Sequence, residues 1–128
     1  MISLILFSIY FNSITKNQEL NKYEKKIADI TKPKFSINGE KQKISITANE
    51  GNFLTDDEIL LEQNVIFQSN KFKIYSDNVV FNKKNLVASS KDKSKFISDT
   101  AQINSIGFDI IENGSIINFK GKTHLILK

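Results

Sequence analysis

The sequence contains no cysteine, no tryptophan and no arginine among its 128 residues. Without cysteine the chain has no disulfide framework, no zinc–thiolate site and no thiol nucleophile. Every basic residue is a lysine, and lysine lacks the planar fork with which arginine reads phosphates and base edges. The formal net charge of +4 therefore gives little support to sequence-specific recognition of nucleic acid.

Residues that build catalytic or metal sites are also scarce. His124 is the only histidine, and a metal site needs more ligands, so a structural or surface role is expected. The acidic run at 56–58 lacks the ligand spacing of a calcium loop and predicts a turn. The sequence has neither a G-x-S-x-G elbow nor a phosphate-binding loop. We therefore expect no metal, no cofactor and no catalytic residue, and we expect that the protein is not an enzyme.

The N-terminal segment, residues 1–15, carries no charged side chain. It predicts a membrane anchor, because Phe7, Tyr10 and Phe11 lie near its polar boundary, where aromatic residues gather. A spanning helix needs about 20 apolar residues, so this anchor is short and its true start would lie upstream of Met1. A signal-peptide core and a buried element of a soluble domain are the alternatives.

Residues 16–32 form the next segment, with apolar residues at helical spacing from Leu20 to Ile30. This spacing predicts a helical stalk that continues the anchor, and a flexible linker is the alternative. The single proline, Pro33, ends the segment because the residue before proline avoids the α region. We expect the folded domain to span residues 33–128, which is the size of one domain.

Beyond Pro33 apolar and polar residues alternate with a period of two, which is typical of β-strands. In residues 44–48 every second residue is apolar. Residues 49–52 predict a turn, and the polar, lysine-rich segment 89–95 predicts an exposed loop or edge. Residues 96–128 consist of short apolar runs cut by glycines, the pattern of a β-meander. The predicted fold class is all-β.

Several predicted strands contain adjacent apolar residues, such as Leu60-Leu61 and Val79-Val80. A sheet buried on one face predicts strict alternation. The pairs therefore indicate either a second, partly covered face or β-bulges that shift the parity. A sheet folded over on itself, with inner faces that only partly close, fits both features.

Apolar residues on one side of these strands form the candidate binding surface. They would line a groove for an apolar ligand if the folded sheet is open, or a sealed core if it is closed, and periodicity does not separate the two. Lysines beside phenylalanines, as in Lys71-Phe72-Lys73, also occur in single-strand nucleic-acid binders. A strand with phenylalanine inward and lysine outward is the simpler interpretation. The expected inner-face residues are Ile44, Ile46, Leu61, Phe67, Phe72, Ile74, Phe81, Phe108, Ile110, Phe119 and Leu125.

Two sets of motifs, near the start and the end of the β region, carry a family resemblance. The first is Pro33-x-Phe35, Gly39 and Ile44-x-Ile46-Thr47-Ala48-Asn49. The second is Gly107-Phe108-Asp109-Ile110, Gly114, Ile117-x-Phe119-x-Gly121-Lys122 and Leu125-x-Leu127. Together with the apolar N-terminal segment, they resemble the periplasmic domain of the LptC family of lipopolysaccharide-export proteins.

The resemblance implies an open antiparallel β-jellyroll, two sheets folded into a V, behind an N-terminal helix or membrane anchor. Such a protein would cross the inner membrane once and hold its β domain in the periplasm. It would accept lipopolysaccharide from an inner-membrane ABC transporter complex and pass it along an apolar groove to a periplasmic β-jellyroll bridge protein. No catalysis, no cofactor and no nucleic acid is implied.

The resemblance also implies free strand edges at both ends, which would pair with partners by β-augmentation. The end near residues 35–48 would face the transporter, and the end near residues 107–127 would face the periplasmic partner. A bulky side chain at Gly107 is expected to impair partner docking. The expected partner-edge residues are Phe35, Gly39, Gly107 and Gly121. The alternative is a structural or adhesin-like β-scaffold with a sealed core and no lipid ligand.

Overall fold

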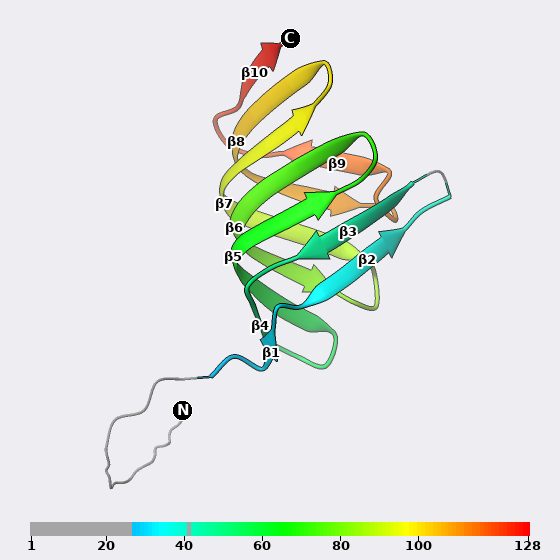
Figure 1. Ribbon diagram of the computed structural model, residues 1–128, viewed down its shortest axis with the longest axis vertical. Coiled ribbons are helices and arrows are strands. Elements are labelled where there is room, and N and C mark those ends of the chain that lie inside the picture. The colour runs from blue at the N-terminus through cyan, green and yellow to red at the C-terminus, as the bar shows by residue number, and fades with distance from the viewer. Residues whose placement is uncertain (1–26, 41) are drawn as a thin grey trace, which may run out of the picture.

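The computed structural model describes residues 27–40 and 42–128, and this part of the chain is all-β. Its ten strands pair antiparallel in one sheet (Figure 1). They are β1 (Ile30–Thr31), β2 (Lys34–Asn38), β3 (Lys43–Thr47), β4 (Glu50–Phe53), β5 (Glu58–Gln68), β6 (Phe72–Asn82), β7 (Val87–Ser98), β8 (Ala101–Ile111), β9 (Ile116–Phe119) and β10 (His124–Leu127). Within these residues there is no helix with the length and hydropathy needed to span a membrane.

The predicted anchor and most of the predicted stalk lie outside the described residues. For the end of the stalk the helix prediction is wrong, because Ile30 and Thr31 form strand β1. They pair with Gly51 and Glu50 of β4, and this tertiary pairing outweighs a short helical spacing. Within the described residues the sheet therefore begins at Ile30, before the predicted domain boundary at Pro33.

Four long strands, β5 to β8, run through two halves of the sheet and change neighbours along their length. The first part of β5 pairs with β4, and its last part pairs with β3. In the same way, the first part of β8 pairs with β10 and its last part with β9. The sheet thus folds over on itself (Figure 1). We call the half with β1, β4 and β9 the β9 half, and the half with β2, β3 and β10 the β10 half.

The corner between the halves crosses the long strands where their pairing is interrupted. The register shifts lie between Glu62 and Val65, between Tyr75 and Val80, and between Ser90 and Lys93. Asn64 in β5 and Gly107 in β8 have positive φ angles of 52° and 102°. Bulges bend a strand and increase its twist, so interruptions in adjacent strands produce a corner. In the pairing of β5 with β6, the adjacent apolar pairs Leu60-Leu61 and Val79-Val80 lie outside the interruption, in regular register. One member of each pair is buried and the other is half-buried, which fits a partly covered second face and not a bulge.

The two halves face each other across a packed apolar core. Phe35 of β2 lies 5.3 Å from Phe81 of β6 between ring centroids, and Phe67 lies 5.4 Å from Phe108. Burying one such side chain contributes about 1.5–3 kcal/mol to folding. The core consists of Ile37, Ile44, Ile46, Ala48, Ile59, Leu61, Val65, Phe67, Ile74, Val79, Phe81, Ala88, Phe108 and Ile110.

The halves are displaced relative to each other along the stack of strands. The contact between Phe35 and Phe81 places β2 opposite β6, and a contact of 5.5 Å between Phe96 and Phe119 places β7 opposite β9. As a result, β1 and β4 extend past the β10 half at one end, and β10 extends past the β9 half at the other (Figure 1). The fold is therefore an open sheet with unlike ends.

Two expectations about irregular segments are wrong. Residues 49–52, expected to form a turn, mostly belong to β4. Residues 89–95, expected to form an exposed loop or edge, lie inside β7, and Ser90 and Ser94 are only 2% and 6% exposed. The polar composition of this segment reflects its place at the corner.

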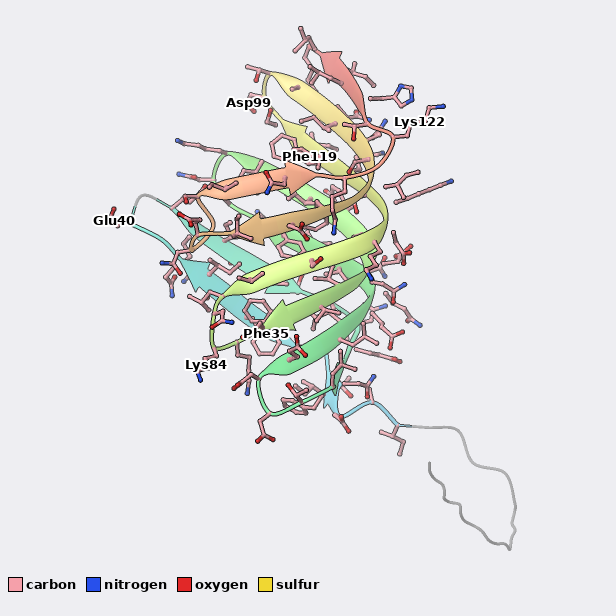
Figure 2. All side chains as sticks on the ribbon, turned by 180° about the vertical axis from the view of Figure 1, so that it is seen from behind. Phe35, Glu40, Lys84, Asp99, Phe119 and Lys122 are labelled. Atoms are coloured by element: carbon pink, nitrogen blue, oxygen red, sulfur yellow. The ribbon has the colours of Figure 1, made fainter. Side chains whose placement is uncertain are left out.

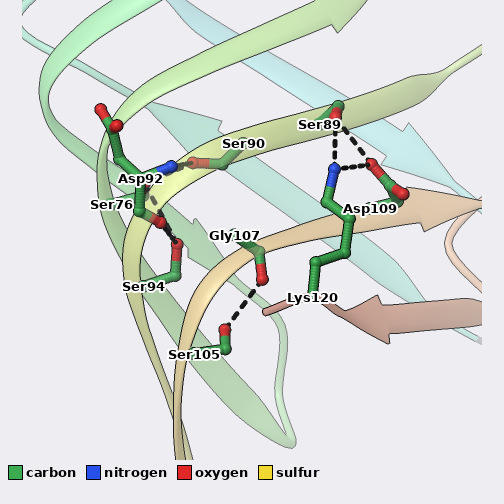
Figure 3. Close-up of polar contacts among 9 residues, drawn as sticks. All are labelled: Ser76, Ser89, Ser90, Asp92, Ser94, Ser105, Gly107, Asp109 and Lys120. Atoms are coloured by element: carbon green, nitrogen blue, oxygen red, sulfur yellow. Dashed lines mark hydrogen bonds and ion pairs between the residues drawn. The ribbon is translucent and has the colours of Figure 1, made fainter. Parts of the chain in front are cut away.

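Small polar side chains fill the inside of the corner (Figure 3). The hydroxyl oxygens of Ser76 and Ser90 lie 3.0 Å apart, and the Ser94 hydroxyl donates to the Ser76 oxygen at 3.3 Å. The Ser105 hydroxyl donates to the Gly107 carbonyl oxygen at 2.9 Å. Because the buried hydroxyls have partners, their burial is tolerated, and serine supplies the small volume that a sharp bend requires.

Candidate functional site

Most of the predicted inner-face residues meet in the buried core. Two more, Phe72 and Phe119, are partly buried and pack against it. Leu125 lies outside it and is 61% exposed. Of the predicted residues, those that are at most 1% exposed are Ile44, Ile46, Leu61, Phe67, Ile74, Phe81, Phe108 and Ile110.

An aromatic cluster marks the boundary of the core at the β9 and β10 end. We call Phe72, Phe96 and Phe119 the Phe cluster. The rings of Phe72 and Phe96 stack at 5.2 Å, and those of Phe96 and Phe119 meet edge to face. Figure 2 shows Phe119 on β9, whereas the labelled lysines lie at the periphery. Phe96 was not among the predicted residues, although it follows the same alternation after Lys95.

Strand β10 continues the inward face of the β10 half past the last strand of the β9 half. Leu125 pairs with Ile103, and Ile103 pairs with Phe96, so these side chains share one face. Leu127 is two residues farther along and shares it too. Among the described residues no strand of the β9 half covers this face, and Leu127 is 75% exposed. We call Ile103, Leu125 and Leu127 the overhang.

Four strands have a neighbour on one side only among the residues that the structure describes: β1, β2, β9 and β10. Of the predicted partner-edge residues, Phe35 lies on β2, Gly39 follows β2, and Gly121 lies between β9 and β10. Gly107, contrary to expectation, does not lie at a free edge. It sits inside β8, and a Cβ there would lie 2.5 Å from the Ser90 carbonyl oxygen of β7. The close strand approach expected at Gly107 exists, but within the same chain.

The outer face carries polar contacts that hold β7, β8 and β9 together (Figure 3). Lys120 Nζ lies 3.0 Å from Asp109 Oδ1, and the Ser89 hydroxyl donates to the same oxygen at 2.6 Å. Partial burial raises the pKa of Asp109, but the hydrogen bond from Ser89 and the hydrogen bond and charge of Lys120 outweigh it, so this pKa lies below its ordinary value. Asp109 alternates with the inward Phe108 and Ile110, so these contacts are separate from the apolar face.

The described residues form no site for metal binding, and the lysine and phenylalanine pairs are explained by the strand pattern. His124 is exposed on β10, and in residues 27–40 and 42–128 no three histidine, cysteine or acidic side chains come together around a metal position. Lysine and phenylalanine take opposite sides of the strands, as expected: Lys73 and Lys95 are exposed, while Phe72 and Phe96 pack on the core. The apolar face is therefore the candidate site.

Comparison with known proteins agrees with this geometry. The family model LptC, described as "Lipopolysaccharide-assembly, LptC-related", matches residues 8–127. A search of curated proteins finds no match for the chain. The family match covers nearly the whole sequence, including the strands that build the core, the Phe cluster and the overhang. The chain therefore belongs to the LptC family, whose members are non-catalytic components of lipopolysaccharide transport.

Proposed function

We propose that the apolar face carries the acyl chains of lipopolysaccharide between two neighbouring proteins. The observation that supports this best is its continuity: it runs from the core through the Phe cluster onto the exposed overhang. Each methylene left in water costs about 0.8 kcal/mol. Acyl chains that cross an aqueous compartment therefore need a continuous apolar surface.

Entry of acyl chains requires the two halves to separate, because the core side chains of both halves are at most 7% exposed and form one cluster. Opposite the corner the halves meet through side-chain packing and a hydrogen bond of 2.8 Å from Gln42 Nε2 to the Gly114 carbonyl oxygen. An acyl chain that enters replaces the apolar contacts which separation removes, since the hydrophobic effect is non-directional. The free energy needed to separate the two halves about the corner is therefore lower when lipid is bound than when it is absent.

The free edges supply the contacts to partners. At one end, the edge of β10 and the exposed Leu125, Ile126 and Leu127 suit an added strand from a periplasmic β-jellyroll protein. At the other end, the edges of β1 and β2 face the inner-membrane ABC transporter complex. Residues 1–15 hold the protein in the inner membrane as a single pass, with the β domain in the periplasm.

Photo-crosslinking tests this function. A photoreactive phenylalanine analogue replaces Phe119 or Phe67 on the apolar face, and Tyr75, 37% exposed, is the matched control on the outer face. In cells that export lipopolysaccharide, Phe119 and Phe67 are expected to crosslink to it, and Tyr75 is not. Absence of crosslinks from Phe119 and Phe67, or equal crosslinking from all three positions, would contradict the proposal.

The alternative function is a structural β-scaffold whose core stays sealed. The observation that favours it is the burial of Phe67, Phe81 and Phe108, each at most 1% exposed. A scaffold needs no path for lipid, so it predicts that the Phe67 position never reaches an acyl chain. The crosslinking experiment separates the two functions.

A further inference from the structure

The end of the domain opposite the overhang is closed by a short segment of chain. We call residues 29–33 the strap, which includes β1 and lies at the lower end of the sheet in Figure 1. Pro33 is buried, and Ile30 packs against the core. A Cβ built at Gly51 would lie 3.2 Å from Pro33 Cγ and 3.5 Å from Leu61 Cδ2, so the strap lies directly on the core.

Few backbone contacts hold the strap in place. Strand β1 pairs with β4 at two positions, Ile30 with Gly51 and Thr31 with Glu50, whereas β5 pairs with β4 at four. The Asp29 amide donates to Asn52 Oδ1 at 3.0 Å, and the Phe53 amide donates to Asp29 Oδ2 at 2.9 Å. In both of these hydrogen bonds the acceptor is an exposed side chain, so neither is a backbone pairing between strands. The outer edge of β4 is therefore only half paired by backbone.

The strap also contains an unfavourable backbone conformation. Lys32 has a φ of 52°, a left-handed value that residues other than glycine seldom adopt. Its amide donates to the Asn49 carbonyl oxygen at 2.9 Å, which fixes the turn between β1 and β2. Release of the strap would relax this residue and would leave Gly51, Ile59 and Leu61 uncovered at an open strand edge.

We propose that the strap is an exchangeable end cap: an edge strand of the inner-membrane transporter complex replaces it on β4 and opens this end of the core to acyl chains. The inference rests on the proposed function. The replacing strand pairs with all four residues of β4 (Glu50–Phe53) and places an apolar side chain where Ile30 lies. Until then the strap covers an edge that would otherwise pair with unrelated chains.

A disulfide lock tests the exchange. The natural chain has no cysteine, so Thr31→Cys with Glu50→Cys introduces the only thiol pair, at directly opposite positions. Opposite Cα atoms in antiparallel strands lie about 4.5–5.5 Å apart, within the range that disulfides bridge. The control lock is Tyr75→Cys with Lys95→Cys, opposite positions of β6 and β7 away from the strap.

The first readout is strand exchange. The probe is a fluorescent peptide that copies residues 28–38, added to the full chain. We call the Thr31→Cys, Glu50→Cys variant the strap-lock protein. The peptide is expected to bind its reduced form at least tenfold more tightly than its oxidised form, and to bind the control protein equally in both states. Equal binding to both strap-lock states, or binding to neither, would overturn the inference. Ile30→Ser, which weakens the strap without a disulfide, is expected to raise peptide binding several-fold.

The second readout separates this inference from the proposed function. Photoreactive residues at Leu61, beneath the strap, and at Phe119, at the other end, report lipopolysaccharide. In the purified full chain mixed with lipopolysaccharide, which can reach the overhang end directly, oxidation of the strap lock is expected to abolish the Leu61 crosslink and to preserve the Phe119 crosslink. Equal Leu61 crosslinks in both states would refute the cap and leave the proposed function intact. Loss of the Phe119 crosslink in both states would refute the proposed function itself.

Discussion

Replacing Gly107 with alanine tests how the corner is built. A Cβ at this position would lie 2.5 Å from the Ser90 carbonyl oxygen and 3.3 Å from Lys91 Cα, both backbone atoms of β7. Neither can move away as a flexible side chain would. The φ of 102° also lies outside the regions that residues with a Cβ adopt readily. The substitution therefore strains β8 and pushes β7 away from it.

Two contributions set the size of the effect. A sparsely populated backbone conformation costs on the order of 1–3 kcal/mol. Displacement of β7 at Ser90 loses about one hydrogen bond, which contributes roughly 0.5–1.5 kcal/mol. We therefore expect Gly107→Ala to lower the free energy of unfolding by about 3 kcal/mol, a large part of the roughly 5–15 kcal/mol that holds a domain folded.

Urea denaturation followed by circular dichroism measures this loss. With a slope of about 1–3 kcal/mol per molar urea, the midpoint is expected to fall by about 1–3 M. Gly121→Ala is the matched control, because Gly121 also has a positive φ, 70°, but its Cβ would stay 3.0 Å from Ile106 Cβ and 3.2 Å from the Ile106 carbonyl oxygen. Its midpoint is expected to fall much less. Equal midpoints for the two variants would refute the reasoning.

Three further predictions concern the core, the overhang and the outer face. Phe108→Ala removes a fully buried ring and is expected to cost about 3–5 kcal/mol, measured by thermal unfolding; a loss below about 1 kcal/mol would contradict the packed core. Leu127→Lys, at a position 75% exposed, is expected to change stability by less than about 0.5 kcal/mol yet to weaken capture of the periplasmic partner, and unchanged capture would argue against an interface there. Lys120→Met removes the partner of Asp109, whose pKa lies below its ordinary 3.8. The ion pair therefore stabilises the fold above that pH, by less than about 1 kcal/mol because Lys120 is partly exposed. This difference from the natural protein is expected in urea titrations at neutral pH and should vanish as acid protonates Asp109; a difference that persists in strong acid would contradict the assignment.

The period-two pattern predicted the all-β class and most of the inward residues, because each strand records in its sequence which face is buried. It did not predict which inward-facing residues are covered by a strand of the opposite half. Leu125 and Ile44 have similar patterns, but Ile44 is 0% exposed and Leu125 61%. The difference comes from the displacement of the two halves, which is set by the corner and not by either strand alone.

Two misread segments have the same kind of cause. Ile30 lies in a helical spacing, but its pairing with Gly51 decides its structure. Ser90 and Ser94 have the composition of a loop, yet they are buried because the corner admits only small side chains, and neighbouring strands supply partners for their hydroxyls. Both outcomes depend on contacts between residues far apart in the sequence. The family resemblance, which draws on the whole chain, is confirmed by the family match.

The most direct test is the distance between the two halves when lipopolysaccharide binds. Spin labels at Lys73→Cys, on the outer face of the β10 half, and Asn118→Cys, on the outer face of the β9 half, report this distance by pulsed electron paramagnetic resonance, since both residues are exposed and no natural cysteine competes. Because the core side chains of the two halves form one buried cluster, acyl chains between the halves should lengthen the mean distance by about 4 Å or more, the separation of packed carbon atoms. An unchanged distance in protein shown to hold lipopolysaccharide would contradict a lipid path through the interior.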